Sequence, residues 1–438
     1  MQARLGDAYP AFLKAMEGDA VTSLRLNAAK PSQAFKDAPQ VPWCPQGRYL
    51  AERPVFTTDP LIHAGAYYVQ EASSMAIWQA VTQSVENLAS ARMLDVCAAP
   101  GGKSTLLASL LGPEGLLVAN EVIGSRASIL RENLIKWGSA NVVVTNNDPR
   151  DFYPYDGFFD CVLVDAPCSG EGLFRRDARA MDEWSEQNVA LCSARQKRIL
   201  NDIVGAVRPG GTLIYSTCTW EEAENEEVAA WLAGEGFEAI PLTMDEAWGM
   251  EATEGGGFRF YPHRVQGEGF YLLAMRKAGE RVATDVLPKK RSKLQVATPA
   301  VRQLAAEWLQ EPESVRLFQR EDEVYAFPAA QAETMQGITD RLKVRKAGVL
   351  MGKLVRDALV PAHDLALSGI CKQDIPAMEL EEENALRYLR KDHLSPSLTQ
   401  GHTGWMLVRF QGLNLGWVKA LPNRINNYFP KEWRIRMR

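Results

Sequence analysis

The alternation of short apolar runs with helical segments between residues 92 and 220 constrains the fold of this chain more than any other feature. The apolar runs are nearly continuous and read RMLDVCAA, GLLVANE, NVVVTNN, FDCVLVDAP and TLIYSTC. Such continuity is typical of parallel strands that are covered on both faces. Helical patterns lie between the runs, at 103–111, 125–137 and 186–207. Repeated strand–helix units of this length predict an α/β fold with a doubly wound parallel sheet.

Weaker patterns surround this sheet and divide the chain. Before it, TSLRLN predicts a strand, and helices are expected at 8–16 and 71–85. After it, GFRFYPHR and GFYLLAMRK predict a closing antiparallel pair, a Lys/Arg-rich stretch predicts a linker, and Gly-spaced apolar runs predict a β-rich module. We therefore expect a small α+β N-terminal domain, a core, a linker, a mixed domain and a β-rich module, at 1–80, 81–280, 281–298, 299–375 and 376–438.

Positive charge is concentrated in the C-terminal part of the chain. The formal net charge is −5, but residues 1–280 carry −12 and residues 281–438 carry +7. Such asymmetry predicts contact with a polyanion, although a solvated basic surface explains the charge equally well. Aromatic residues interleave with this charge, and they either stack on bases or form the core of a small β module. They are Trp405, Trp417, Tyr428 and Trp433.

Composition disfavours several functional classes. The seven cysteines form no C-x-x-C pair, and the five histidines form no H-E-x-x-H motif. This distribution indicates reduced thiols and argues against a disulfide framework or a metal site. No run approaches the roughly 18 apolar residues of a transmembrane helix, and the N-terminus lacks signal-peptide features. We expect a cytoplasmic, monomeric protein that uses neither a membrane nor a metal.

The segment LDVCAAPGGKSTLLASLL, residues 94–111, carries the sharpest local signal. A buried strand leads through a turn of small residues into a helix near Lys103. Small residues let a ligand approach the backbone, and the helix N-terminus offers free N–H groups to a carboxylate or phosphate. A Walker A loop is incomplete, because Cys97 stands where its first glycine is required, and G-x-G-x-x-G is absent. The turn therefore predicts a ligand site that is neither a Walker A loop nor a dinucleotide-binding loop.

Three acidic residues follow successive strands of the predicted sheet. Glu121, Asp148 and Asp165 stand at the ends of the second, third and fourth strands. Ligands of open α/β sheets bind outside the carboxyl ends of the strands, where an acid can accept hydrogen bonds from ribose hydroxyls. A single acid there is most often a helix N-cap, but three beside a Gly-rich turn favour a nucleoside cofactor. The lack of phosphate motifs favours S-adenosylmethionine over NAD or ATP.

Two cysteines lie on the same predicted rim. Cys168 follows the fourth strand in VDAPCSGEG, and Cys218 follows the fifth in YSTCTWEEAENEE. A single cysteine is usually a small buried hydrophobe, but two thiols at adjacent strand ends are candidates for nucleophilic catalysis. Glu224 and Asn225, in the same segment, are interpreted as caps of the following helix.

Taken in order, these motifs resemble those of a known family. DVCAAPGGKS, DAPCSGEG and STCT resemble the two-cysteine RNA cytosine-C5 methyltransferases of the RsmB/RsmF group, over residues 1–280 and including TSLRLN and VQEASS. The C-terminal GWVKALPNRINNYFPKEWRIR resembles the end of a PUA-like RNA-binding module of the RsmF branch. The resemblance implies a Rossmann-like class I methyltransferase core, an RNA-recognition-like N-terminal domain and S-adenosylmethionine as cofactor. It also implies cytosine methylation in small-subunit (16S) ribosomal RNA, with transfer RNA as the alternative.

The resemblance also implies roles for the candidate residues. Cys218 would attack cytosine C6, which makes C5 nucleophilic enough to take a sulfonium methyl group. Asp165 would face N3, and Cys168 would assist loss of the C5 proton or release of the RNA. In DNA cytosine methyltransferases the nucleophile lies in the Pro-Cys motif, which would make Cys168 the attacker. The implied cofactor contacts are Cys97, Ala98, Ala99, Pro100, Gly101, Gly102 and Lys103 at the methionine end, Glu121 at the ribose, Asp148 at the adenine, and Arg126 and Asp165.

Two other functions compete with this interpretation. A non-catalytic RNA-binding or ribosome assembly protein can retain such a fold, but binding alone does not require Cys168, Cys218 and Asp165 together. A nucleotide hydrolase, suggested by GGKST, lacks the first glycine of its loop. We therefore expect an enzyme that acts on RNA.

Overall fold

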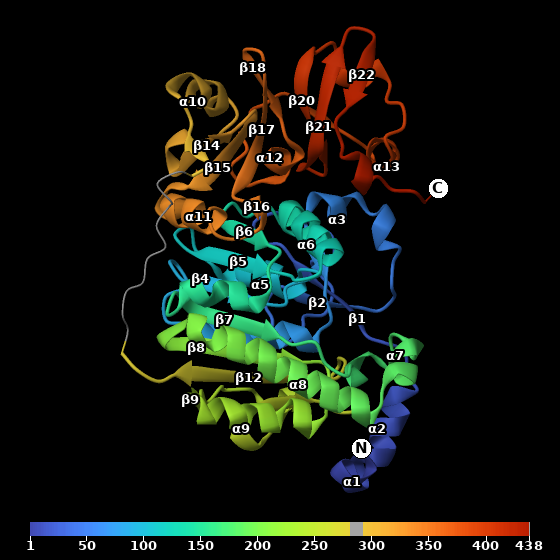
Figure 1. Cartoon of the computed structure of the whole chain (residues 1–438). Coiled ribbons are helices and arrows are strands. Elements are labelled where there is room, and N and C mark those ends of the chain that lie inside the picture. Colours follow the sequence, from blue (N-terminus) through green and yellow to red (C-terminus); the bar gives the residue numbers. More distant parts are fainter. Residues whose placement is uncertain (281–291, 438) are drawn as a thin grey trace.

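The computed structural model describes residues 1–280 and 292–437, and a large mixed sheet lies at its centre (Figure 1). In spatial order this sheet consists of β10 (Glu251–Ala252), β11 (Phe258–Phe260), β12 (Phe270–Lys277), β8 (Val207–Thr217), β7 (Phe159–Asp165), β4 (Arg92–Asp95), β5 (Leu116–Asn120), β6 (Val142–Thr145) and β16 (Val344–Ala347). A further strand, β9 (Phe237–Ala239), pairs with β12. Of the predicted linker at 281–298, residues 281–291 lie outside the described residues.

The middle of the sheet is parallel, which confirms the prediction from the apolar runs. β4 pairs in parallel with β5 and β7, and β6 and β8 continue the sheet in the same direction. Helices α5 (Gly102–Leu110), α6 (Gly124–Trp137) and α8 (Glu186–Ile203) lie between these strands in the chain. β11 and β12 form the predicted antiparallel pair beyond β8. The core is therefore a doubly wound α/β domain.

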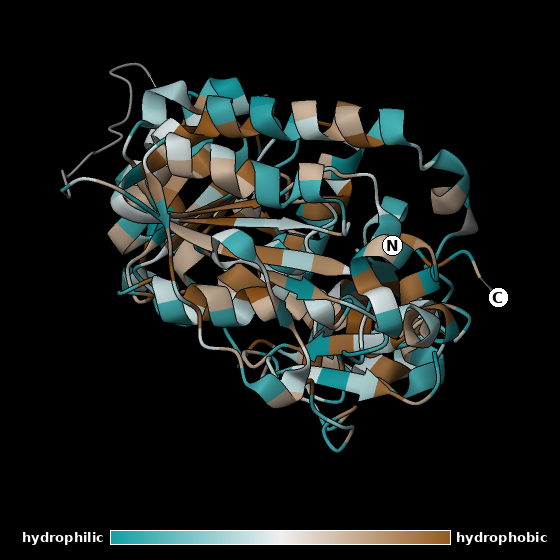
Figure 2. Ribbon diagram, turned by 90° about the horizontal axis from the view of Figure 1, so that it is seen from below, coloured by the Kyte–Doolittle hydropathy of each residue, from teal (hydrophilic) through white to brown (hydrophobic). Residues whose placement is uncertain are grey.

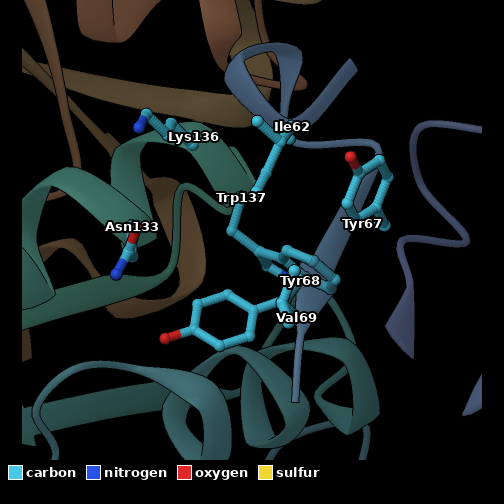
Figure 3. Close-up of a pocket in the computed structure, with 8 residues that line it drawn as sticks. Ile62, Tyr67, Tyr68, Val69, Asn133, Lys136 and Trp137 are labelled. Atoms are coloured by element: carbon cyan, nitrogen blue, oxygen red, sulfur yellow. The ribbon is translucent and has the colours of Figure 1, made fainter. Parts of the chain in front are cut away.

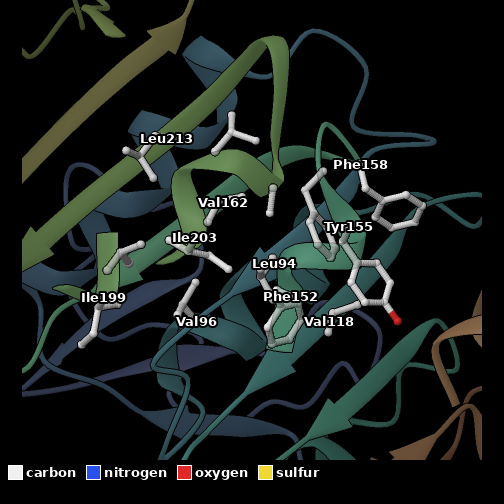
Figure 4. Close-up of a cluster of buried hydrophobic side chains, with 14 of the residues drawn as sticks. Leu94, Val96, Val118, Phe152, Tyr155, Phe158, Val162, Ile199, Ile203 and Leu213 are labelled. Atoms are coloured by element: carbon white, nitrogen blue, oxygen red, sulfur yellow. The ribbon is translucent and has the colours of Figure 1, made fainter. Parts of the chain in front are cut away.

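Alternate residues of the central strands contribute to two cores, one on each face of the sheet. Leu94 and Val118 belong to the cluster shown in Figure 4, whereas their neighbours Met93 and Leu117 belong to the other cluster. All four side chains are fully buried. Successive side chains of a strand point to opposite faces, so a continuous apolar run supplies both cores at once. In Figure 2 the hydrophobic colours concentrate along the strands in the middle of the molecule.

The N-terminal region forms a small antiparallel sheet beside the core. Its strands and helices are β2 (Gly47–Leu50), β1 (Thr22–Leu26) and β3 (Tyr67–Val69), in spatial order, with α1 (Gln2–Leu5), α2 (Tyr9–Met16), α3 (Pro60–Ala64) and α4 (Ile77–Ser84). α2 confirms the helix predicted at 8–16. The helix predicted at 71–85 is present as the 3-10 helix η3 (Ser73–Ala76) followed by α4, and the Glu71 carboxylate accepts hydrogen bonds from the backbone N–H groups of Ser73 and Ser74, at 2.8 Å each, at its start.

The C-terminal region contains two further sheets. The first consists of β13 (Gln295–Val296), β14 (Val315–Arg320), β15 (Glu323–Pro328), β17 (Val349–Val355) and β18 (Ala358–Pro361), accompanied by α10 (Pro299–Ala306), α11 (Ala332–Thr339) and α12 (His363–Leu367). The second consists of β19 (Ala377–Glu379), β20 (Gly404–Phe410), β21 (Leu413–Leu421) and β22 (Arg424–Asn427), accompanied by α13 (Glu382–Arg390). The second sheet is the β-rich module predicted near the C-terminus. Two more helices, α7 (Ala178–Glu183) and α9 (Glu226–Gly234), belong to the core.

The C-terminal region contacts the rest of the chain at several places, and two of these contacts involve whole sheets. β16 pairs antiparallel with β6 at the edge of the central sheet. Elsewhere, the buried Leu24 and Tyr67 of the N-terminal sheet share a hydrophobic core with Met378 and Val408 of the four-stranded sheet. Both contacts join residues that are far apart in the sequence. Within residues 1–280 and 292–437, no helix has the length and apolarity needed to cross a bilayer.

Candidate active site

The predicted site residues gather at the carboxyl edge of the central sheet. A cavity of 170 Å³ lies there, between the loop that follows β4 and the segment 68–74 of the N-terminal region. It is lined by Tyr68, Val69, Gln70, Glu71, Ser74, Cys97, Ala98, Ala99, Pro100, Gly102, Lys103 and Asp165. The structure thus brings together seven of the residues that the sequence singled out. Gly101, Glu121, Arg126, Asp148, Cys168 and Cys218 lie outside this lining.

The loop after β4 is shaped by Gly101 and by the start of α5. Gly101 is the N-cap of α5 and has a φ of 118°, in the left-handed region that favours glycine. A Cβ at this position would lie 3.3 Å from Leu130 Cδ1, so the loop also packs closely on α6. The first turn of α5 presents backbone N–H groups that have no partner within the helix. This arrangement suits a ligand carboxylate or phosphate.

Glu121 is buried at the end of β5, and Arg126 reaches it from α6. Glu121 Oε1 accepts a hydrogen bond from the backbone N–H of Ile123 at 2.8 Å, and Oε2 lies 3.4 Å from Arg126 Nη1. Arg126 Nη2 donates to the carbonyl oxygen of Ala99 at 2.8 Å. The half-exposed Arg126 therefore joins the acid at one strand end to the loop at the next.

Asp148 is the N-cap of the 3-10 helix η4 (Pro149–Tyr155). Its Oδ1 accepts a hydrogen bond from the backbone N–H of Arg150 at 3.3 Å, and its own N–H donates to Asp151 Oδ2 at 3.2 Å. The capping role expected of a lone acid therefore holds at this strand end. The side chain keeps 26% of its surface exposed, so its carboxylate is still open to a ligand.

Asp165, at the end of β7, is paired with Lys103 from the first turn of α5. Lys103 Nζ lies 2.7 Å from Asp165 Oδ2, and Ser216 Oγ donates to Oδ1 at 2.8 Å. Burial alone would lower the pKa of Lys103, but the charge of Asp165 and its hydrogen bond outweigh burial and raise this pKa. Lys103 therefore stays charged and fixes the direction of the Asp165 carboxylate.

The two predicted cysteines lie in contact at the ends of β7 and β8. Their Sγ atoms are 3.2 Å apart, and the backbone N–H of Cys218 donates to Cys168 Sγ at 3.3 Å. Both are free thiols. The hydrogen bond with Cys218, followed by burial, raises the pKa of Cys168 well above its ordinary value. Cys168 is therefore held in the thiol form near neutral pH.

Glu224 holds the Cys168 loop through hydrogen bonds, which differs from the predicted role as a helix cap. It is fully buried, and its carboxylate accepts hydrogen bonds from the backbone N–H and the hydroxyl of Ser169. Gln196 Nε2 donates to Glu224 Oε2 at 2.6 Å and to the carbonyl oxygen of Pro167 at 3.1 Å. Burial raises the pKa of Glu224, and the hydrogen bonds from Ser169 and Gln196 oppose that shift. The helix-cap interpretation failed because proximity to α9 in sequence says nothing about contact with a distant loop.

Asn225 and Glu171 hold the Cys218 loop. Asn225 Oδ1 accepts a hydrogen bond from Thr217 Oγ1 at 2.7 Å, and its Nδ2 donates to the carbonyl oxygen of Thr219 at 3.0 Å. Glu171 Oε2 accepts hydrogen bonds from Thr219 Oγ1 at 3.0 Å and from the backbone N–H of Trp220 at 2.8 Å. Asn225 forms no side-chain cap for α9, so its predicted role was wrong as well. Glu171 was missed by the sequence analysis, although its place within the DAPCSGEG motif is a signal that could have found it.

The second wall of the cavity comes from the N-terminal region, where sequence reasoning had placed no site residue. Arg25 of β1 is fully buried and donates to Gln70 Oε1 at 2.9 Å and to Thr105 Oγ1 at 2.6 Å. It also lies 3.3 Å from the carbonyl oxygen of Gly102. Burial lowers the pKa of Arg25 to about 10, so the side chain remains charged. The segments TSLRLN and VQEASS, noted for their resemblance, are the ones that this arginine joins to α5.

A second cavity adjoins the first across Tyr68. It measures 210 Å³ and shares Tyr68 and Val69 with the cavity described above. Figure 3 shows the Tyr68 ring directed toward the side of α6 that carries Asn133. Asn133 Nδ2 donates to the carbonyl oxygen of Pro100 at 2.8 Å. The loop after β4 is thus held by Arg25 from the N-terminal sheet and by Asn133 from α6. In the described part of the chain, no cluster of three or more His, Cys, Asp or Glu side chains suits a metal ion.

The fold and the site together define a class, the Rossmann-like methyltransferases that carry a pair of thiols at adjacent strand ends. Family models agree with this class. Residues 83–276 match "16S rRNA methyltransferase RsmB/F", residues 1–72 match "N-terminal domain of 16S rRNA methyltransferase RsmF", and residues 375–435 match "Methyltransferase RsmF PUA domain".

Similar proteins specify the family further. The chain is 31% identical to ribosomal RNA small subunit methyltransferase F of Salmonella agona (strain SL483), over 97% of this chain and 92% of that protein. It is 33% identical to the protein of the same name from Aeromonas salmonicida (strain A449), over 90% and 84%. This chain belongs to the ribosomal RNA small subunit methyltransferase F family. The predicted enzyme class and the predicted resemblance are thereby confirmed.

Solved structures agree on the core. A methyltransferase homolog protein from Pyrococcus horikoshii is 29% identical, with a TM-score of 0.53 over 62% of this chain and 91% of that chain. NSun6 from Pyrococcus horikoshii is 19% identical, with a TM-score of 0.54 over 64% and 97%, and shows the same fold.

Proposed function

We propose that this protein methylates C5 of a cytosine in 16S ribosomal RNA, with S-adenosylmethionine as the methyl donor. The chain belongs to a family of ribosomal RNA methyltransferases, and within that family one observation carries the proposal. The Sγ atoms of Cys168 and Cys218 lie 3.2 Å apart at adjacent strand ends. Beside them is the Lys103–Asp165 ion pair, and the charge of Lys103 interacts with Cys218. Binding of RNA alone does not require such a constellation.

The residues at the carboxyl edge fit the proposed cofactor. The N-terminus of α5 offers N–H groups to the methionine carboxylate, and the buried Glu121 at the end of β5 is placed to accept ribose hydroxyls. Asp148 keeps a partly exposed carboxylate for the adenine amino group. Arg126 fixes Glu121 and the carbonyl of Ala99 relative to each other. When bound, S-adenosylmethionine supplies an electrophilic methyl group.

The proposed chemistry begins with Cys218. Its thiolate adds to cytosine C6, and the electron pair of the C5–C6 double bond becomes available at C5 to bond the methyl carbon. Asp165, held by Lys103 and Ser216, faces N3 and stabilises the ring by hydrogen bonding. The C5 proton then passes to solvent, a step that Cys168 assists, and the C–H electron pair re-forms the C5–C6 double bond while the C6–S bond breaks and releases the Cys218 thiolate.

We assign RNA contact to the four-stranded C-terminal sheet. The rings of Trp405 and Tyr428 lie 4.4 Å apart, Lys419 Nζ lies 5.5 Å from the Trp405 ring, and Tyr428 is 40% exposed. Exposed aromatic rings beside a positive charge suit stacked bases and phosphates. Trp417, by contrast, is fully buried and serves the core of the module. Because 16S ribosomal RNA is a cytoplasmic substrate, we place the protein in the cytoplasm. We also propose that it acts as a monomer.

Bisulfite sequencing of total RNA from cells with and without this gene tests the proposal. We expect one or more protected cytosines of small-subunit RNA to lose protection when the gene is absent. Loss of protection in transfer RNA instead would retain the chemistry and overturn the ribosomal substrate. An unchanged pattern in every RNA would reject the enzymatic proposal in favour of an RNA-binding role.

A further inference from the structure

A strand from the C-terminal region completes the edge of the sheet where the cofactor is proposed to bind. β16 (Val344–Ala347) pairs antiparallel with β6, so that Val344 lies opposite Thr145 (Figure 1). Thr145 is the last residue of β6, and Asn146, Asn147 and Asp148 follow it on the carboxyl edge. The strand therefore starts beside the residues that lead into the proposed adenine contact.

Besides the pairing of β16 with β6, three hydrogen bonds join Lys343 and Arg345 to the two residues that follow β6. The backbone N–H of Asn146 donates to the carbonyl oxygen of Lys343 at 2.8 Å. The backbone N–H of Lys343 donates to Asn147 Oδ1 at 3.0 Å. Arg345 Nη2 donates to Asn146 Oδ1 at 2.8 Å. Two of the three bonds involve asparagine side chains, so the contact acts on side-chain direction as well as on backbone pairing.

The Asn146 side chain links Arg345 to the two residues that follow β5. Its Nδ2 donates to the carbonyl oxygens of Glu121 and Val122, at 2.8 and 2.9 Å. Asn146 is buried, so its amide groups must find their partners within the protein. Arg345 has only donors, and it therefore holds the amide with Oδ1 toward itself and Nδ2 toward the two carbonyls. A flipped amide would place an oxygen against those carbonyls and an NH₂ group against the guanidinium.

We infer that Arg345 is a positioning residue for cofactor binding. Through Asn146 it fixes the main chain at Glu121 and Val122, and so sets where the Glu121 carboxylate stands at the proposed ribose site. The C-terminal region, from which the basic RNA-binding module also extends, is thus a structural part of the cofactor site. This inference rests on the proposed use of S-adenosylmethionine and names a residue outside the motifs that carry the chemistry.

Calorimetric titration of the full chain with S-adenosylmethionine, without RNA, tests the inference. We expect Arg345→Ala to weaken binding about tenfold, because the hydrogen bond from a charged donor to the buried Asn146 amide is lost. Steady-state assays should show a higher KM for S-adenosylmethionine, an unchanged KM for RNA and an unchanged kcat at saturation. Arg302→Ala, which removes an exposed arginine of α10, is the matched control and should bind like the wild type.

A double-mutant cycle tests the proposed route through Asn146. In the Asn146→Ala background, Arg345→Ala should cause no further loss of cofactor affinity, because its acceptor is gone. Equal losses in both backgrounds would overturn the route. If the wild type binds S-adenosylmethionine and Arg345→Ala binds it equally well, the inference is wrong. If Arg345→Ala raises only the KM for RNA, Arg345 is an RNA contact and the inference is again wrong. A wild-type chain that binds no S-adenosylmethionine would reject the proposed cofactor instead.

Discussion

The loops that carry Cys168 and Cys218 are held by buried carboxylates of the core itself, whereas the loops at the ends of β4, β5 and β6 receive support from distant parts of the chain. We call the loops that carry Cys168 and Cys218 the thiol half of the rim, and the loops at the ends of β4, β5 and β6 the cofactor half. In the thiol half, Glu224 and Glu171 accept several hydrogen bonds each. In the cofactor half, Arg25 arrives from the N-terminal sheet and Arg345 from the C-terminal region. In the thiol half, several hydrogen bonds depend on one buried carboxylate, so its removal breaks them all. In the cofactor half, the hydrogen bonds go to different carbonyls, hydroxyls and amides, so one substitution breaks only a few of them. We therefore expect abrupt losses from changes in the thiol half and graded losses from changes in the cofactor half.

The largest effect is expected at the two thiols. Cys218→Ala should reduce methyl transfer by roughly 10³-fold or more, because no nucleophile remains for C6. Cys168→Ala should accumulate a covalent RNA–protein adduct that survives denaturing electrophoresis, because release is impaired. The Cys218→Ala protein should form no adduct. An adduct with Cys218→Ala, and none with Cys168→Ala, would show that the roles are reversed.

The support under the Cys168 loop should be the next most sensitive. Glu224→Ala leaves the donors of Ser169 and Gln196 buried without their acceptor, and we expect a loss of about 3 kcal/mol in the free energy of unfolding. Urea denaturation measures this loss. Glu227→Ala, at an exposed residue of the following helix α9, whose one ion-pair partner among the described residues is Lys197 Nζ at 4.0 Å, should cost less than about 0.5 kcal/mol. Similar losses in both variants would contradict the concentrated support of the thiol half.

A buried acid beneath the cofactor half is expected to titrate near neutrality. Asp95, at the end of β4, is fully buried, and among the described residues only Ser104 Oγ is seen to donate to its carboxylate, at 2.6 Å. Burial raises the pKa of Asp95 to about 7. Because the folded state binds this proton more tightly than the unfolded state, stability falls as pH rises between the unfolded value near 4 and about 7.

Asp95→Asn should remove this dependence while keeping an acceptor for Ser104. From pH 5 to pH 8 the wild type should lose about 2 kcal/mol relative to the variant, measured by urea denaturation at both values. Asp160→Asn, at an acid paired with Arg208, is the control and should retain the wild-type difference between the two pH values. A pH dependence that Asp95→Asn leaves unchanged would show that Asp95 is already ionised at pH 5.

The smallest effect is expected at Arg126. It is half-exposed, and its contacts with Glu121 and the Ala99 carbonyl are partly screened by solvent. Arg126→Ala should weaken S-adenosylmethionine binding about threefold, without a measurable change in unfolding. Calorimetry and thermal denaturation of the same samples separate the two quantities. A loss of hundredfold or more would mean that support in the cofactor half is concentrated in one residue after all.

Much of this architecture was predictable from local sequence. The five central strands, the helices between them and the closing antiparallel pair follow from the pattern of apolar residues, which indicates burial on both faces of the strands, and from the helical segments that separate the strands. Because the carboxyl ends of parallel strands meet at one edge, the same pattern placed the loop at 97–103, the strand-end acids and both cysteines on one rim. The motif order then indicated the family.

Tertiary contacts were needed for the rest. β16 is a four-residue strand, VRKA, whose place beside β6 comes from pairing across about two hundred residues of chain and leaves no periodic signal. The buried position of Glu224 depends on a loop more than fifty residues away in sequence. Periodicity describes how a residue relates to its own strand or helix. Hydrogen bonds between distant side chains exist only once the chain has folded, and they are what positions the loops of this rim.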